Sequence, residues 1–268
     1  MDPFFRNPIS CIVGSMSFDP RRPPAQSIGI WRLTRGIKWI MIANVCVYVI
    51  ELVTYHWLKT DDMIVHLSLT PMRVFPGLEI WQPLTYMWMH DPTSPGHLML
   101  NMAGLWMFGT LLEDRWGVAG MLKFYVLTGL LSGLAVLLVG FISGSVETIT
   151  LGASGAIYAV VIAFGMLFPN LTIYFLGLLP IKAKWIVYVT IGGTVLYWLA
   201  RTPGISVAAH TGGLVAGALL ISGWWNPARA WRSIRARLLR RKLRLIEREL
   251  EQRRDEEPPK DKDDIVYH

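Results

Sequence analysis

The sequence predicts an all-α membrane protein with six transmembrane helices. Of its 268 residues, 53% are hydrophobic and only 17% are charged, and the mean hydropathy is +0.39. Soluble domains usually carry more charge, so this composition is typical of an integral membrane protein. A helix needs roughly 20 mostly apolar residues to cross a bilayer. We expect six such helices, near residues 37–58, 97–112, 120–142, 150–168, 185–200 and 205–224.

Two connecting segments are too apolar to be ordinary solvated loops. The loop of about 59–96, between the first two helices, is rich in Trp, Tyr and Met, which predicts that it lies in the outer membrane interface. The segment from Leu171 to Leu179 is apolar, but it is short and bounded by prolines. We expect it to form an interfacial or re-entrant segment that leads into the fifth helix.

The basic residues predict that both termini are cytoplasmic. With that orientation, all but three of the 26 Lys and Arg residues lie on the inner side, the exceptions being Lys59, Arg73 and Arg201. This distribution follows the positive-inside rule. An even number of helices requires the same placement of the termini. The protein is therefore expected to be a multi-pass protein, and its expected location is the bacterial inner (plasma) membrane.

The segments around the membrane domain (37–224) differ from it in composition. Residues 1–36 form a basic, Pro-rich leader, expected to be poorly ordered. Residues 225–254 are strongly basic, with apolar residues at helical spacing, which predicts an amphipathic helix on anionic lipid. A short coiled coil is the alternative for that segment. Residues 255–268 are mostly acidic and are expected to be disordered.

Three of the predicted helices enter the membrane from the outer side, and each has a reactive residue near its beginning. His97 opens the second helix, Ser154 lies about five residues into the fourth, and His210 about five into the sixth. At ~1.5 Å per residue, Ser154 and His210 would lie roughly 5–10 Å below the outer surface. Asn101 follows His97 by one turn on the same face. These polar side chains could therefore converge in the outer half of the bundle.

The residue types fit acyl transfer. Serine is a weak nucleophile until a base removes its proton, and histidine is the natural base near neutral pH. No acidic residue is placed to orient His210, so we predict a Ser154–His210 dyad rather than a triad. His97 and Asn101 could donate hydrogen bonds to an oxyanion, together with the unpaired N–H groups at the start of the fourth helix.

The glycines near these residues allow two interpretations. Gly152 and Gly155 flank Ser154, and Gly213 and Gly217 follow His210 in a small-xxx-small pattern. Such patterns normally indicate only close helix contact, and a lone serine in a membrane helix is usually a packing residue. Here the glycines would also let the chain turn at the serine and let the sixth helix approach closely. Packing and chemistry would then use the same geometry.

An alternative from another class is a metal or proton pathway in a transporter, lined by His90, His97 and His210. Ionisable groups inside membranes are costly and often functional. However, we expect no carboxylate beside these histidines in the outer half of the bundle, and no metal-ligand spacing is present. The serine chemistry is therefore favoured. No cofactor, no metal and no nucleic acid partner are expected.

These motifs resemble those of the rhomboid intramembrane serine proteases. The similarity covers about residues 37–224, nearly the whole predicted membrane domain. The three motifs are Gly152-Ala153-Ser154-Gly155 (GxSG), Ala209-His210-Thr211-Gly212-Gly213 followed by Gly217 (AHxxGxxxG), and His97-Leu98-Met99-Leu100-Asn101. A lone GxSG is weak, but all three motifs on the second, fourth and sixth predicted helices are very specific. Gly109, Glu113 and Gly117 also fit the family pattern.

The resemblance implies a six-helix rhomboid bundle and an endopeptidase that cleaves other membrane proteins in or near their transmembrane segments. It implies Ser154 as nucleophile and His210 as general base. It places His97 and Asn101 in the oxyanion hole, and Tyr158 against the catalytic histidine. Expected substrates have helix-weakening residues near the outer end and a small residue before the cut. A catalytically inactive rhomboid-like binding or quality-control factor is the alternative, against which the intact motifs argue.

Two departures from the family pattern lie in the outer loop. Rhomboids commonly have Trp-Arg where this chain has Trp81-Gln82, which bears on how the loop is anchored. Residues 91–96, before His97, form a longer and more Pro-rich connection than usual, which bears on substrate access. Neither departure touches the residues expected to carry the chemistry.

Overall fold

The computed structural model describes residues 32–175, 179–200 and 207–223, with single positions at 235, 239, 243, 246 and 247. The chain divides into two compact units, Met1–Ile221 and Ser222–His268, and the first contains every predicted site residue. Most of the leader, the basic segment and the whole acidic tail lie outside the described residues, so their expected structures stay predictions.

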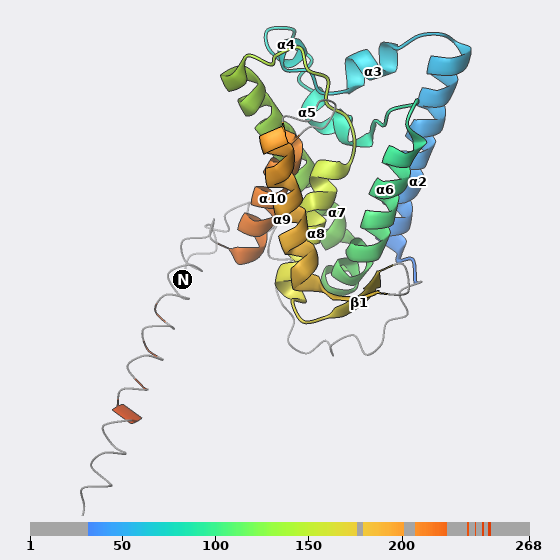
Figure 1. Cartoon of the computed structure of the whole chain (residues 1–268). Helices are drawn as coiled ribbons and strands as arrows, with labels where there is room; N and C mark the ends of the chain where they lie inside the picture. The colour runs from blue at the N-terminus through green and yellow to red at the C-terminus, as the bar shows by residue number, and fades with distance from the viewer. Residues whose placement is uncertain are drawn as a thin grey trace, which may run out of the picture. The chain divides into compact units, whose positions relative to one another are not determined.

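The first unit is built almost entirely from helices. Its principal helices are α2 (Arg35–Leu52), α6 (Pro95–Gly104), α7 (Thr110–Ser143), α8 (Ser154–Leu167), α9 (Ala183–Ala200) and α10 (Val207–Ser222). A π-helical segment, Val53–Trp57, extends α2, and another, Leu105–Gly109, joins α6 to α7. Figure 1 shows these helices arranged around α8.

Within the described ranges, three helical stretches are long and apolar enough to cross a membrane: Arg35–Trp57, Pro95–Ser143 and Ala183–Ala200. The second is not one straight helix, because Gly117 has φ 74° and ψ 171° and interrupts it. This break separates the second and third predicted helices. The helices α8 and α10 are apolar but shorter than a usual spanning helix. The architecture is thus that of an integral membrane protein, and the count of six crossings stays a prediction.

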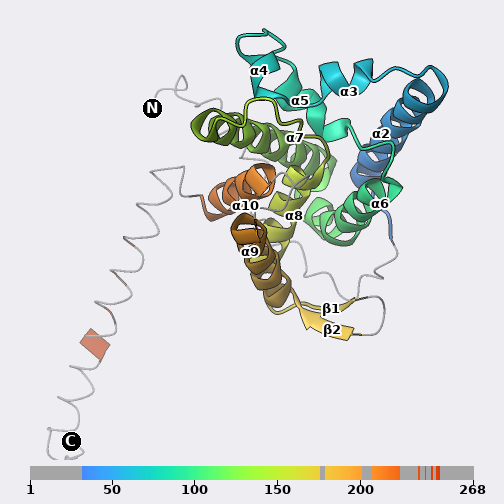
Figure 2. The ribbon, with the colours of Figure 1, turned by 45° about the horizontal axis from the view of Figure 1, so that its top comes forward.

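Helix α8 forms the centre of the unit, and Figures 1 and 2 show it surrounded by the other principal helices. Nearly all of its residues from Gly155 to Gly165 are buried. Glycines allow α10 to approach it: a Cβ on Gly213 would collide with the Gly155 carbonyl oxygen, and one on Gly217 would lie 2.8 Å from Ala159 Cα. The small-xxx-small pattern therefore marks a real close contact between α8 and α10.

Glu113, near the beginning of α7, caps the beginning of α2. Its carboxylate accepts hydrogen bonds from the Thr34 hydroxyl and from the backbone N–H groups of Gly36 and Ile37, each at 2.7 Å. The first N–H groups of a helix have no partner within the helix, and the positive end of its dipole favours an anion. One buried carboxylate therefore satisfies three donors and joins the two helices.

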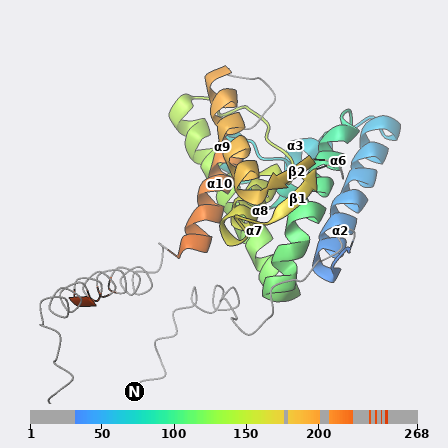
Figure 3. The same ribbon diagram turned by 60° about the horizontal axis from the view of Figure 1, so that its bottom comes forward.

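The segment from Leu171 to Leu179 contains the first strand of a β-hairpin, and its expected interfacial or re-entrant position stays a prediction. Strands β1 (Thr172–Phe175) and β2 (Leu179–Lys182) pair antiparallel, with Ile173 opposite Ile181, and lead directly into α9. β-branched and aromatic residues favour a strand in β1, and Pro180 is tolerated because both strands are edges. Figures 1 and 3 show the hairpin at the end of the unit opposite to the outer loop.

The loop between α2 and α6 contains short helices: α3 (Asp62–Leu67), α4 (Pro71–Val74), α5 (Gln82–Thr85) and a 3₁₀ turn, Tyr86–Trp88. Several large apolar side chains in it are exposed, including Phe75, Leu78 and Ile80. This exposure fits the expected position in the membrane interface, which stays a prediction. The loop is attached to α7 by Tyr86, whose hydroxyl donates to the Gly129 carbonyl at 2.8 Å.

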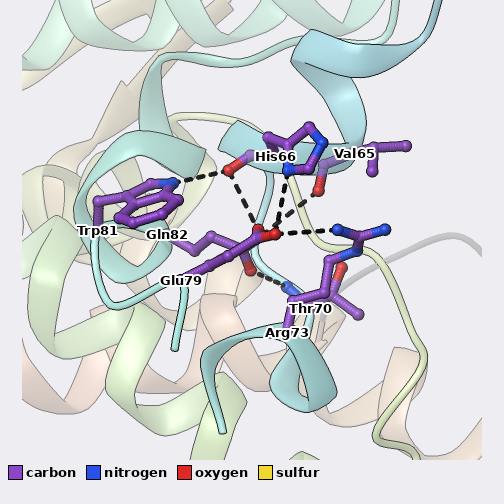
Figure 4. A network of polar contacts seen from close by, with 7 residues as sticks. All are labelled: Val65, His66, Thr70, Arg73, Glu79, Trp81 and Gln82. Atoms are coloured by element: carbon purple, nitrogen blue, oxygen red, sulfur yellow. Dashed lines mark hydrogen bonds and ion pairs between the residues drawn. The ribbon is translucent and has the colours of Figure 1, made fainter. Parts of the chain in front are cut away.

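Gln82, which stands where rhomboids commonly have arginine, anchors this loop (Figure 4). The residue is fully buried, and its Oε1 accepts the Thr70 N–H at 2.8 Å. Its Nε2 donates to the Glu79 carboxylate and to the carbonyls of Val65 and His66. The neighbouring Trp81 Nε1–H donates to the His66 carbonyl at 2.9 Å. A neutral amide thus links three parts of the loop without an arginine.

Glu79 is the charged member of the same network. Its Oε1 lies 2.9 Å from Arg73 Nη1 and 3.0 Å from His66 Nδ1 (Figure 4). Burial by itself raises the pKa of the Glu79 carboxyl, but hydrogen bonds and charge from His66 and Arg73 outweigh that effect. The pKa of Glu79 therefore lies below its ordinary value, and the carboxylate stays charged at neutral pH.

Candidate active site

The first two residues of the GASG segment, Gly152 and Ala153, form a turn that leads into α8. Gly152 has φ +112°, a conformation that L side chains rarely adopt, and its N–H donates to the Tyr86 carbonyl at 2.9 Å. The expectation that Ser154 lies about five residues inside the helix is wrong: α8 begins at Ser154 itself. A helix cannot begin at 150 because Thr150 pairs with Leu69 in a β-bridge and Gly152 is left-handed.

The structure brings Ser154 and His210 together from two helices. His210 lies in the first turn of α10, and its Nε2 is 2.9 Å from Ser154 Oγ. The serine hydroxyl can donate to this nitrogen, so the ring then carries its proton on Nδ1. His210 Nδ1 is buried and has no hydrogen-bond partner among the described residues. No carboxylate is therefore seen to orient this histidine within those residues.

Tyr158, one turn after Ser154, lies flat against the His210 ring. The two ring centroids are 4.1 Å apart and the ring planes differ by only 9°. Because Tyr158 and Ser154 are four residues apart on one helix, they lie on the same face. The imidazole is thus held between the serine hydroxyl and the aromatic ring.

His97 and Asn101 lie beside the GASG turn. His97 is in the first turn of α6 and is half-buried, and a Cβ on Gly152 would come within 2.6 Å of its Cε1 atom. Asn101, one turn further, is buried, and its Nδ2 lies 3.7 Å from the same Cβ position. The open face of Gly152 is therefore lined by an imidazole and an amide.

His90 is expected from the sequence only as part of the alternative metal or proton pathway. In the structure it contacts Asn101 and His97 directly. Its ring is fully buried, its Nε2 lies 3.1 Å from Asn101 Nδ2, and its centroid lies 5.3 Å from that of His97. Its Nδ1 lies 3.3 Å from the Trp88 carbonyl oxygen. Burial, and secondarily the charge of His97, lowers the pKa of His90 to about 4. The ring is therefore neutral at physiological pH.

The expectation that no carboxylate lies beside these histidines is wrong. Glu51, near the C-terminal end of α2, is fully buried, and both of its carboxylate oxygens accept the backbone N–H of His90 at 3.0 Å. The sequence signal for this contact was a single acidic residue inside an apolar helix, since such residues are costly and usually have a partner. The partner lies 39 residues away, so spacing could not reveal it.

Within the described ranges, no group of three or more His, Cys, Asp or Glu side chains could hold a metal ion. Glu51 reaches the backbone of His90 rather than a ring nitrogen. The arrangement around His90 is therefore a hydrogen-bonded chain of polar groups.

The apolar helices define an integral membrane protein with a polar site at the beginning of three helices. Residues 77–226 match the family model described as the Rhomboid domain. The chain belongs to the rhomboid family.

Named relatives support the same family. The mitochondrial RHOMBOID-like protein 12 of Arabidopsis thaliana is 31% identical over 138 residues, which are 46% of this chain and 41% of the relative. Rhomboid-like protease 3 of Toxoplasma gondii is 22% identical over 191 residues, 70% of this chain and 68% of the relative. The mitochondrial Rhomboid protein 1 of Saccharomyces cerevisiae is 30% identical over 136 residues, 48% of this chain and 37% of the relative.

The matches with the Arabidopsis and yeast proteins thus cover about two fifths of those proteins. The three relatives are eukaryotic, and two are named as mitochondrial. They give no support to the expected bacterial inner membrane.

Proposed function

We propose that this protein is an intramembrane serine endopeptidase, with Ser154 as nucleophile and His210 as general base. The observation that carries the proposal is the 2.9 Å separation of Ser154 Oγ and His210 Nε2, between residues 56 positions apart. A serine hydroxyl within hydrogen-bond reach of an imidazole is the arrangement that activates serine for acyl transfer. Membership of the rhomboid family, and the name of the Toxoplasma protease, favour the same reaction.

The chemistry follows from the two side chains. Ser154 Oγ forms a bond to the substrate carbonyl carbon while its proton passes to His210 Nε2. When the tetrahedral intermediate collapses, the C–N bond breaks and His210 gives the proton to the leaving amine. Water then attacks the acyl carbon while His210 takes its proton; the bond from that carbon to Ser154 Oγ breaks, His210 returns the proton to Oγ, and the acid is released. In this dyad, stacking on Tyr158 holds the imidazole, as the acidic residue of a triad otherwise would.

His97 and Asn101 are proposed to stabilise the oxyanion of that intermediate. Both lie against the open face of Gly152, two residues before the nucleophile. The first N–H groups of α8 have no partner within their helix and add to the positive potential there. Preorganised donors of this kind stabilise the developing negative charge strongly because they need no reorganisation.

The proposed substrates are transmembrane segments of other proteins. We propose six crossings with cytoplasmic termini, so that Ser154 lies in the outer half of the membrane. A peptide bond within a helix is sheltered by its hydrogen bonds, so a substrate must unwind locally before attack. Residues that weaken a helix near its outer end, and a small residue before the cut, would favour cleavage. Binding of anionic lipid by residues 225–254 also remains a proposal.

A fluorophosphonate probe tests this function on the purified protein in detergent, because it reacts with an activated serine. We expect labelling and cleavage of a model transmembrane substrate to be lost in Ser154→Ala and retained in Ser143→Ala. Ser143 is an exposed serine at the end of α7 and serves as the matched control. Intact cleavage by Ser154→Ala would overturn the proposal. A folded wild type that neither reacts nor cleaves would favour a catalytically inactive family member.

A further inference from the structure

A chain of hydrogen bonds runs from the C-terminal end of α2 to the proposed oxyanion site. Glu51 accepts the His90 N–H with both carboxylate oxygens, and His90 in turn contacts Asn101 through its ring. The three side chains come from α2, from the loop before α6 and from α6 itself, and all are at most 5% exposed. Buried polar groups of this kind need their partners, since leaving one unpaired costs about 1–3 kcal/mol.

The hydrogen bonds of the His90 ring fix which nitrogen carries its proton. Nδ1 faces the Trp88 carbonyl oxygen, which can only accept, so Nδ1 must be the donor. Burial keeps the ring neutral, and Nε2 is therefore an acceptor. Only an N–H group of Asn101 can satisfy it, at the observed Nδ2···Nε2 distance of 3.1 Å. The Trp88 carbonyl thus determines the orientation of the Asn101 amide.

This orientation matters because the two ends of an amide have opposite roles. With Nδ2 toward His90, one N–H bonds to the ring, and the second remains to donate beside the open face of Gly152. A flipped amide would place its carbonyl oxygen there and would repel an oxyanion. Glu51 contributes by holding the His90 backbone, and Tyr48 and Asp91 are ionisable groups that interact with its carboxylate.

We propose that His90 is a positioning residue that, held by Glu51, fixes the Asn101 amide with its N–H groups toward the developing oxyanion. The inference rests on the proposed function of Asn101 and adds two residues that do not touch the substrate. Losing the acceptor on His90 should lower kcat through Asn101 and leave KM nearly unchanged, since the oxyanion exists only in the transition state.

The test is a double-mutant cycle in detergent, with cleavage of a model transmembrane substrate as the readout. His90→Leu removes the acceptor, and His90→Gln keeps a carbonyl oxygen of similar reach. We expect kcat to fall about 10–100-fold in His90→Leu and less than about threefold in His90→Gln. The larger loss does not exceed the loss expected when one oxyanion donor is removed altogether. In an Asn101→Ala background, His90→Leu should cost less than a further threefold, because its effect passes through the amide.

A second pair of variants covers the case in which His90→Leu does not fold, as judged by thermal unfolding. Glu51→Gln keeps one acceptor for the His90 N–H, whereas Glu51→Leu keeps none. We therefore expect only Glu51→Leu to lower kcat, and we expect this loss to disappear when Asn101 is already replaced by alanine. If the kcat losses of the two single variants multiply in the double variant of either cycle, the positioning role is overturned. Cleavage that depends on Ser154, and with it the proposed function, would still stand. Cleavage that survives Ser154→Ala would instead overturn the proposed function and this inference together.

Discussion

The phenol ring of Tyr158 and the imidazole of His210 are stacked face to face, with centroids 4.1 Å apart and planes within 9°. The acid of a catalytic triad would instead accept a hydrogen bond from Nδ1 in the plane of the imidazole, whereas the tyrosine covers one face of the ring. An aromatic ring restricts rotation of the imidazole but offers no acceptor for its Nδ1–H. The proposed base is therefore oriented by packing, and its protonated form gains no carboxylate partner among the described residues.

Two substitutions at Tyr158 distinguish the contribution of its ring to activity from that of its hydroxyl. Tyr158→Phe keeps the stacked surface, so we expect kcat within about threefold of the wild type. Tyr158→Ala frees the imidazole to rotate, and we expect kcat to fall about 10–100-fold, in line with the cost of misplacing a catalytic group. Steady-state kinetics on a model substrate would measure both. Equal losses in the two variants would mean that the hydroxyl, rather than the stack, is required.

Removal of the proposed oxyanion donor should slow turnover without weakening substrate binding. We expect Asn101→Ala to lower kcat by about 10²–10³-fold, the usual effect of losing one such donor. KM should stay close to its wild-type value. If KM rose and kcat did not change, Asn101 would be a residue that binds substrate in its ground state.

Gly152→Ala should abolish activity, because a methyl group there meets the His97 ring and the backbone is left-handed. Gly144→Ala is a matched control: Gly144 is also left-handed, at φ +72°, but a Cβ on it would meet nothing within 4 Å. Gly144→Ala carries αL backbone strain of about 1–2 kcal/mol, and Gly152→Ala carries at least as much because its φ of +112° lies outside the αL region. Only Gly152→Ala should lose labelling by a fluorophosphonate. Similar activity in the two variants would show that the space beside His97 is not needed.

The outer loop should lose stability in acid through Glu79. Since its pKa is lowered on folding, its contribution is fully present above the unfolded value of 4.5 and is lost as pH falls through the lower folded value. We expect Glu79→Gln to lower the stability by about 0.5–1 kcal/mol at pH 7, a modest value because Arg73 and His66 are partly exposed. Thermal unfolding from pH 7 to pH 3 should show this difference shrinking. A constant difference would mean that the charge of Glu79 does not contribute.

Periodic and local features of the fold could be predicted from the sequence. The helices lie near the predicted residues because apolar composition over roughly 20 residues is a local property. The motif residues Ser154 and His210 meet because the turn at Gly152 places Ser154 at the start of α8, and Gly213 lets α10 approach α8 closely. The position of Ser154 at the first residue of α8 was missed, since it depends on the backbone angle of Gly152 and on the pairing of Thr150 with Leu69.

Contacts between distant residues could not be predicted. Nothing in the spacing of Glu51 and His90 shows that a carboxylate at the end of one helix reaches a backbone N–H in a loop. The hairpin was missed for a related reason: a strand is stabilised by its partner, and most of β2 lies between the predicted segment 171–179 and the predicted fifth helix at 185–200. The acidic residue in an apolar helix indicates that Glu51 has some partner, but spacing along the chain identifies neither that partner nor the pairing of the two strands.

The carboxylate of Glu113 has a consequence for how the chain assembles. Its three donors belong to residues at the start of α2, between 76 and 79 positions earlier in the chain. During synthesis α2 is therefore made long before the carboxylate that caps its N-terminal end. Bonds across such sequence separations form late, because the intervening chain must first be closed into a loop. The N-terminal end of α2 consequently acquires its final stability only after the helical segment that carries Glu113 has packed beside it.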